Sequence, residues 1–500
     1  MTGRRTLTFV ALLAASGLAG CSLAPRYVRP EAPVAPSWPS GDAYLVQREA
    51  ALPAVSYRDI FTDPRFQALV ERALANNRDI RVAAANLAAA RAQVRVVRAS
   101  QFPEVDASAS VRRTDVDGSS GGSSGGSSGG GAGGSGGTGG TGTGGTLSTS
   151  SSSGTSYTAS LGVSSFELDL FGRLANATEA QRQTALATEA VSRTVRLGLV
   201  ADLASAWAQY ASDGDLLRIA QSTADSASKS VALSRARLSG GVAPRTELRQ
   251  AEQILATAEA DLALQTTAVA QDRNLLVLLA GGPVDPALLP GSLAEVIVSV
   301  RTLPAGTSSD VLLRRPDVLS AEYRLRSANA NIGVARAALF PRISLTGLLG
   351  LASDSLASLF SGGAFRTTLG AGASYSIFNA GGARAGVAVS QAQRDAALAT
   401  YEKAIQTAFR EVSDALARQG TIGAELAAVQ RQEAATADAA VLTTARYRGG
   451  VASSLENLDA QRSLYTAQRA LVREQLLVVQ NRVTLYRVLG GDQLTPPPAQ

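Results

Sequence analysis

Two residue types that carry much enzyme chemistry, His and Cys, are nearly absent from this sequence. It contains no His and one Cys among 500 residues, which excludes imidazole metal sites, Ser-His-Asp triads and His general bases. A phosphate-binding P-loop and a paired-carboxylate signature are also missing. We therefore predict no catalytic residue, no metal site and no cofactor, and a catalytic function is the least favoured one.

The single Cys closes a segment that is typical of exported proteins. A basic start, an apolar run and small residues precede Cys21 in MTGRRTLTFVALLAASGLAGC, so residues 1–20 are predicted to be a secretory signal peptide. The ending LAGC resembles the bacterial lipobox, in which cleavage leaves the Cys as a lipidated N-terminus. We expect a covalent diacylglycerol and an N-acyl lipid on Cys21. The alternative is a plain signal peptide with an incidental Cys.

The net charge of +6 does not point to a nucleic-acid partner. The Arg residues are dispersed among Asp and Glu and do not cluster in one patch. Such a distribution is typical of a solvated helical surface. We therefore expect no nucleic acid among the partners.

The two halves of the sequence repeat three blocks in the same order. The first block, LANNRDIRVAAANLAAARAQVRVVRASQFPEVDAS, aligns with LLRRPDVLSAEYRLRSANANIGVARAALFPRISLT. The second pairs AQRQTALAT with AQRDAALAT, and the third pairs RLSGGVAPRTELRQAEQIL with RYRGGVASSLENLDAQRSL. We predict two copies of one structural unit, over residues 63–282 and 310–491.

A Gly/Ser tract at residues 118–154 resembles a linker between domains. However, the spacing between copies falls from 238 residues at the first block to 212 at the second, so the first copy holds 26 extra residues in that interval. The tract lies there and interrupts the first unit. We expect it to be an oversized loop joining two strands.

Each unit carries two segments with a period of two residues. Apolar residues at Val105, Ala107, Ala109 and Val111 alternate with polar ones, which predicts strands over residues 104–116, 157–170, 342–350 and 364–378. Such strands are typical of transmembrane β-barrels; a soluble hairpin packed on a helix is the alternative. Because lipid does not tolerate an open sheet edge, copies of the chain would have to share a barrel of eight, twelve or sixteen strands.

Helical periodicity fills most of the remainder. One helix is expected over residues 63–99, with Asp63 as N-cap, and two very long ones over about 173–238 and 383–448. At 1.5 Å per residue each long helix spans about 100 Å. A pair of glycines then ends each long helix, because Gly permits the left-handed backbone conformation. The chain can thereby fold back as a shorter helix that packs against the long one. A coiled-coil cylinder of helical hairpins is predicted.

Several motifs together resemble the TolC-like outer-membrane factors, in particular the lipoprotein branch that serves resistance-nodulation-division (RND) efflux pumps. They are the lipobox, SLAPRYVRPEAPVAP, FELDLFGR, RRPDV, LFPRISLTG and the doubled RxxGGV turn. The resemblance implies a homotrimer with a shared 12-stranded outer-membrane barrel and a long periplasmic α-helical barrel. It implies a passive exit duct in a Gram-negative outer membrane, in contact with outer-membrane lipid, a periplasmic membrane-fusion adaptor and an RND-type inner-membrane transporter.

The same resemblance implies functional residues. Glu456 and Asp459 match the position where acidic side chains ring the pore, and Asp414 and Arg418 are candidate links that hold this periplasmic gate closed. The candidate adaptor-docking turns comprise Arg237, Gly240, Gly241, Val242, Arg446, Gly449, Gly450 and Val451. The alternatives are ordinary exposed charges for the first set and turn geometry alone for the glycines.

The family also implies an equatorial region, formed by residues 21–62 and 283–309, and a short tail at 492–500. Two other functions remain open. The chain could be the outer-membrane channel of a type I protein secretion system, or a coiled-coil scaffold lipoprotein between membrane and cell wall. The cargo is not readable from the sequence, because a wide duct carries little specificity.

Overall fold

The computed structural model describes residues 22–41, 43–44, 56–114, 154–302 and 308–491. The signal peptide, Cys21, most of the Gly/Ser tract and the C-terminal tail lie outside these residues. The chain divides into two compact units. We call them the sheet unit (residues 1–27, 92–182 and 327–394) and the helical unit (residues 28–91, 183–326 and 395–500).

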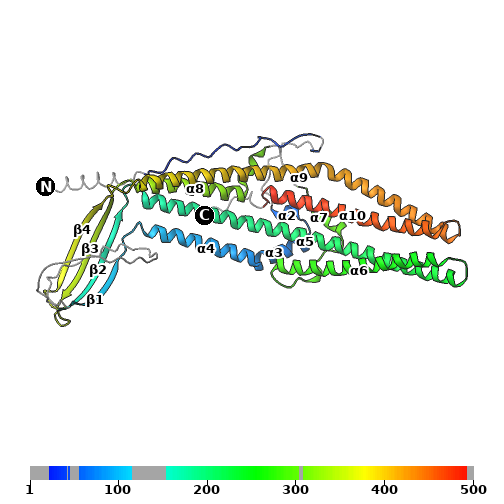
Figure 1. The fold of residues 1–500 in the computed structure, drawn as a ribbon, viewed down its shortest axis with the longest axis horizontal. Helices are drawn as coiled ribbons and strands as arrows, with labels where there is room; N and C mark the ends of the chain where they lie inside the picture. Colours follow the sequence, from blue (N-terminus) through cyan, green and yellow to red (C-terminus); the bar gives the residue numbers. More distant parts are fainter. Residues whose placement is uncertain (1–21, 42, 45–55, 115–153, 303–307, 492–500) are drawn as a thin grey trace, which may run out of the picture. The chain divides into compact units, whose positions relative to one another are not determined.

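The sheet unit contains one antiparallel sheet in the order β1-β2-β3-β4. Its strands are β1 (Asp106–Thr114), β2 (Gly154–Leu168), β3 (Arg342–Ser353) and β4 (Phe365–Ser374). Figure 1 shows the four strands side by side, with each repeat contributing one hairpin. Every side chain of β4 is exposed, as are those of β1 from Asp106 to Arg113. Among the described residues of the sheet unit, the two edge strands therefore have neither a second neighbouring strand nor a covering layer.

Strand β4 is shorter than the sequence predicts. Alternation suggests a strand to residue 378, but the last pair of the β3–β4 ladder joins Arg342 to Ser374. The residue before Arg342 is Pro341, which has no N–H to donate to a further rung. Residues 375–381 instead form a turn before the next helix.

The helical unit begins with α2 (Tyr57–Ile60) and α3 (Pro64–Asn76). Asp63 caps α3 as predicted, accepting a hydrogen bond from the backbone N–H of Arg65. The single helix expected over residues 63–99 is wrong, because the chain breaks at Asn77 and continues as α4 (Arg78–Ala99). The Asn77 side chain accepts from the N–H groups of Asp79 and Ile80, at 2.8 and 3.2 Å, and so caps the second helix.

Two helices of 67 residues each dominate the chain, α5 (Arg173–Ser239) and α9 (Gly382–Arg448). Helix α6 (Arg245–Ala280) returns along α5, and α10 (Ser454–Val488) returns along α9, as Figure 1 shows. The remaining elements are η1 (Pro286–Leu288), α7 (Leu293–Ser299), η2 (Ser309–Arg314) and α8 (Pro316–Ala337). None of the described helices is both long and apolar enough to cross a membrane.

An aromatic cluster forms the core of the helical unit. Phe61 lies between Phe66 and Tyr486, with ring centroids 4.9 and 5.3 Å away, and Phe66 also contacts Trp207 at 5.4 Å. The Trp207 indole donates to the carbonyl of Leu288 at 3.0 Å. Segments from both repeats and from the connection between them thus share one core, which joins helices α3, α5 and α10.

Candidate periplasmic gate and docking turns

The two helical hairpins turn in the same way. The N–H of Val242 donates to the carbonyl of Arg237 at 3.0 Å, and the N–H of Val451 donates to that of Arg446 at 2.9 Å. Gly241 and Gly450 have φ values of +74° and +76°, so each ends its helix in the left-handed conformation that favours Gly. The doubled motif therefore encodes one turn geometry twice.

The first glycine of each pair is not required by this geometry. Neither Gly240 nor Gly449 has a positive φ. A Cβ at Gly240 would lie 3.5 Å from the nearest atom, the carbonyl oxygen of Ala236, and one at Gly449 would find the same spacing at Ala445. These are ordinary van der Waals contacts. The expectation that turn geometry explains both glycines thus holds for Gly241 and Gly450 alone.

The hairpin turns also expose apolar side chains at equivalent positions. Val242 is 69% exposed and Val451 is 72% exposed. Leu455, in the first turn of α10, is 62% exposed. Beside the Gly pairs, which have no side chains, Val242 exposes an apolar surface on the first hairpin tip, and Val451 and Leu455 expose one on the second.

A polar cluster joins the two hairpins next to their turns. The hydroxyl of Tyr447, from α9, donates to Oε1 of Glu247, from α6, at 3.0 Å. Arg237, from α5, donates to the same hydroxyl at 2.8 Å and lies over the Tyr447 ring at 5.4 Å. Glu247 is only 9% exposed. A buried carboxylate with two partners makes this a specific connection between the repeats.

A second connection lies further along the same helices. Tyr465 of α10 donates to Oδ2 of Asp261 of α6 at 2.8 Å, and Arg469 donates to the same oxygen at 3.3 Å. Burial first, and then the hydrogen bond to Asp261, raise the pKa of Tyr465 to about 12. The hydroxyl therefore keeps its proton, and so its donor role, throughout the neutral range.

The predicted ring residues lie near the tip of the second hairpin and are exposed. Glu456 is the third residue of α10 and forms a capping box, in which its carboxylate accepts from the N–H of Ser453 at 3.1 Å. Asp459 pairs with Arg462 at 2.6 Å. Each carboxylate thus has a local partner within the chain, in addition to any role toward the pore.

Asp414 and Arg418 do not join this group. Arg418 pairs with Glu425 at 2.9 Å and with Glu474 of α10 at 3.4 Å. It precedes the last residue of α9, Arg448, by 30 residues, which corresponds to about 45 Å along the helix. Asp414 is exposed one turn further away. The structure therefore separates these two residues from Glu456 and Asp459.

Sequence reasoning missed Glu247, Tyr447, Asp261, Tyr465 and Arg469. The repeat itself held a signal for the first of them, because Glu247 occupies the position in the first repeat that Glu456 occupies in the second. Both are the third residue of their helices. One is buried against the other repeat, whereas its counterpart is exposed.

Cys21 lies outside the described residues, but the chain that follows it is anchored in the sheet unit. The hydroxyl of Ser22 donates to Oδ1 of Asn176, in the first turn of α5, at 2.8 Å. The carbonyls of Leu23 and Pro25 accept from Arg336 and Asn329 of α8, at 3.1 and 2.7 Å. Ser22 is thereby held close to the junction between strand β2 and helix α5.

Comparison with known proteins identifies the architecture. The family model described as "Outer membrane efflux protein" matches residues 69–282 and 307–491, which cover both repeats. The chain belongs to this family. It is therefore an outer-membrane efflux protein, as the motifs predict, and the predicted fold class of a trimeric outer-membrane channel with a helical barrel is confirmed.

Individual relatives agree with the family. The antibiotic efflux pump outer membrane protein ArpC and the toluene efflux pump outer membrane protein TtgC, both of Pseudomonas putida, are each 40% identical over 476 residues, which is 95% of this chain and 93% of the relative. The open-state crystal structure of the MtrE outer membrane channel of Neisseria gonorrhoeae is 30% identical, with a TM-score of 0.79 over 95% of this chain and 99% of that one.

Proposed function

We propose that three copies of this chain form the passive exit duct of a tripartite efflux pump, with the gate at the tips of the α5–α6 and α9–α10 hairpins. The observation that carries this proposal is the cluster of Glu247, Tyr447 and Arg237, which ties the two hairpins together beside their turns. A duct of long helices is widened at its end by moving hairpins apart. The bonds that oppose this movement are therefore the candidates for holding it closed.

The sheet supports closure by three copies. Within the part of the chain that the structure describes, strands β1 and β4 each pair on one side only, and an open sheet edge is not tolerated in lipid. Three sheets of four strands give a 12-stranded barrel, whose lumen is wide enough to conduct. The long helices, three times four, would continue the wall on the periplasmic side.

The pore side of the gate is assigned to Glu456 and Asp459. Both are exposed near the hairpin tip, and three-fold symmetry would turn each into a ring of three carboxylates. Such rings attract cations and repel anions. Arg418, about 45 Å along α9 from the turn, is proposed to stabilise the shaft of the hairpin through Glu425 and Glu474. Neither Arg418 nor Asp414, one helical turn further away, is proposed to act in the gate.

The hairpin turns are the proposed docking surface for a periplasmic membrane-fusion adaptor. Exposed Val242 and Val451 and the small Gly240 and Gly449 give the three-copy assembly six similar tips. Arg237 is a less suitable docking residue than expected from the sequence, because its guanidinium already donates to the hydroxyl of Tyr447. An RND-type inner-membrane transporter is proposed as the energised partner, in line with the efflux relatives. We propose no catalytic step.

The lipid on Cys21 is proposed for a geometric reason as well as for its motif. Ser22 is fixed beside the end of β2, where the chain enters helix α5. An acyl chain attached one residue earlier would reach the inner leaflet of the outer membrane. Its acyl chains would add apolar anchorage to a protein that already spans the membrane.

Complementation tests this function. The chain, expressed with its neighbouring adaptor and transporter genes in a strain that lacks efflux ducts, should restore resistance to the transporter's substrates. Omission of either partner should abolish the effect. Secretion of a protein substrate by a type I transporter, with no effect on small-molecule resistance, would instead establish the type I secretion channel. Relatives with equal identity are named for antibiotics and for toluene, so we propose no cargo class.

A further inference from the structure

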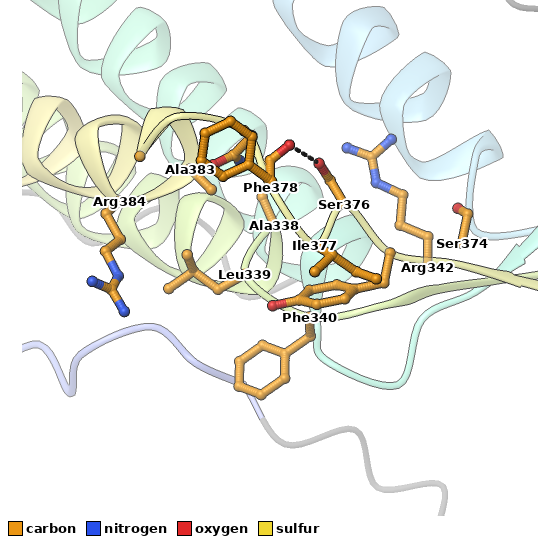
Figure 2. Close-up of a pocket in the computed structure, with 13 residues that line it drawn as sticks. Ala338, Leu339, Phe340, Arg342, Ser374, Ser376, Ile377, Phe378, Ala383 and Arg384 are labelled. Atoms are coloured by element: carbon orange, nitrogen blue, oxygen red, sulfur yellow. Dashed lines mark hydrogen bonds between the residues drawn. The ribbon is translucent and has the colours of Figure 1, made fainter.

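An open pocket of about 660 Å³ lies where strand β3 begins and strand β4 ends, and both polar and apolar side chains line it. It is lined by the segment after α8, the first residue of β3, the last residue of β4 with the turn that follows it, and the first turn of α9, as Figure 2 shows. Its apolar side chains include Phe340, Tyr375, Ile377 and Phe378. Ile377 is 92% exposed and Phe378 is 87% exposed, which is unusual for neighbouring large apolar residues and marks an interaction surface.

In the first repeat, the corresponding turn packs against an aromatic ring from the other repeat. There, the turn between β2 and α5 consists of residues 169–172, and its Phe171 stacks on Phe340 of the second repeat. The ring centroids are 4.5 Å apart and the planes differ by 17°. The turn that leaves one repeat is thus closed by the Phe-Pro segment that enters the next.

Among the described residues, no ring stacks in this way on the corresponding turn of the second repeat. Its turn between β4 and α9 is three residues longer, over residues 375–381, and carries Ile377 and Phe378. The residue equivalent to Phe340 is Phe102, because Phe102-Pro103 aligns with Phe340-Pro341 at the repeat spacing of 238. Phe102 is itself 58% exposed and lies four residues before the first residue of edge strand β1.

We infer that the pocket is the seat for Phe102 of the partner subunit, a second copy of this chain, whose strand β1 pairs with β4. The inference rests on the proposed trimer and assigns to it a contact and a register. Three copies of a chain with two repeats place six similar repeats in a ring. The junction between copies then reproduces the junction between repeats.

The ladders fix the register of this junction. The β1–β2 pair Asp106–Gly162 corresponds to the β3–β4 pair Ser344–Gly372. A residue of β1 therefore has its equivalent in β3 at a number 238 higher, and a residue of β2 has its equivalent in β4 at a number 210 higher. The β2–β3 pair Val163–Gly347 is the template for the new junction. The β4 equivalent of Val163 is Ala373, and the β1 equivalent of Gly347 is Ala109. At the junction between copies, Ala373 therefore lies directly opposite Ala109 of the partner subunit.

Cysteine cross-linking tests the register. The double variant Ala109→Cys, Ala373→Cys should form covalent dimers and trimers under mild oxidation, seen on denaturing gels without reductant. The matched control Ala109→Cys, Leu369→Cys is displaced by four residues, or about 13 Å, beyond the reach of a disulfide. It should give no cross-link, and neither should the two single variants.

The outcomes separate this inference from the proposed function. If trimers are intact by native mass spectrometry but the displaced pair cross-links instead, the register is overturned and the duct stands. If no trimer exists in detergent or membranes, the proposed assembly fails first. A trimer in which neither pair cross-links would overturn the pairing of β1 with β4.

The seat itself is tested by coupling between its two sides. Phe102→Ala and Phe378→Ala should each lower the temperature at which trimers dissociate, and the double variant should lower it by less than the sum, because both remove one contact. Phe102→Leu, which keeps apolar volume, should recover part of the loss. Strictly additive effects would mean that the two rings do not meet, as expected if lipid fills the pocket, and would overturn the assignment.

Discussion

The hydroxyl of Tyr447 donates a 3.0 Å hydrogen bond to the nearly buried carboxylate of Glu247, 200 residues earlier in the chain. The bond joins helix α9 to helix α6 and thereby one helical hairpin to the other. Arg237 completes the cluster from helix α5. Because a buried carboxylate that loses its partners is costly, this connection is broken only when something compensates for it. Docking of an adaptor on the adjacent turns could provide that compensation.

Gly240 and Gly449 should matter for docking and not for folding. Both accept a Cβ without a close contact, so the double variant Gly240→Ala, Gly449→Ala should form trimers of unchanged heat stability. It should nevertheless lose cross-linking to the adaptor and efflux-dependent resistance. Gly241→Ala is the matched control, since its φ of +74° makes Ala cost about 1–2 kcal/mol there. Full efflux activity of the double variant would show that the turns do not bind the adaptor through these faces.

Asp459 should contribute to cation binding at the pore. We expect Asp459→Ala to raise single-channel conductance or to weaken block by divalent cations in planar bilayers, because a ring of like charges is removed. Arg462→Ala should act in the opposite direction, since it frees the carboxylate that it now pairs at 2.6 Å. Asp438→Ala, an exposed change further up α9, is the control. Unchanged block in both Asp459→Ala and Arg462→Ala would remove Asp459 from the pore.

Asp272 should make the stability of the helical unit depend on pH. Burial first, and then the hydrogen bond and charge of Asp213, raise the pKa of Asp272 to about 7. Its pKa is higher in the folded state than in the unfolded chain, so its stabilising effect is complete below about pH 4 and is lost as the pH rises through about 7. Melting temperatures should fall across this window in the natural protein and less in Asp272→Asn. An equal slope in both proteins would contradict the assignment.

The Gly/Ser tract should be dispensable for assembly. Thr114, which precedes the tract, and Gly154, its last residue, are paired at the end of the β1–β2 ladder, so a short turn suffices to connect them. Replacement of residues 119–150 by a four-residue Gly/Ser loop should leave trimer heat stability and efflux nearly unchanged. A collapse of expression or of barrel stability would show that the tract supports the fold.

The repeat and the alternation predicted the elements well, because both are local or periodic properties. Strands β1, β2 and β3 and the two 67-residue helices lie close to where the pattern placed them, but β4 ends four residues earlier than predicted. The break at Asn77 was missed, since a capping side chain competes with helix continuation within a single turn. The connection of Glu247 to Tyr447 was also missed. It depends on how two hairpins pack, and no periodicity in the sequence relates residues so far apart.

The placement of Asp414 and Arg418 shows the same limit. Their charges and their long helix suggested gate links, but their distance from the turn follows from a helix that continues without interruption to Arg448. The glycine pairs illustrate the reverse case. The sequence showed where the turns are, and only the backbone angles distinguish the glycine that each turn requires from the one that it does not.

The single-channel conductance of the purified protein in planar bilayers tests the account most directly. The natural protein should show small, infrequent openings, and Tyr447→Phe, which removes only the hydroxyl that binds Glu247 and Arg237, should show larger or more frequent ones. Tyr210→Phe, a change at another half-buried Tyr of the same unit, should behave like the natural protein. Identical conductance in the natural protein and in Tyr447→Phe, with both trimers intact, would contradict a gate held closed by this cluster.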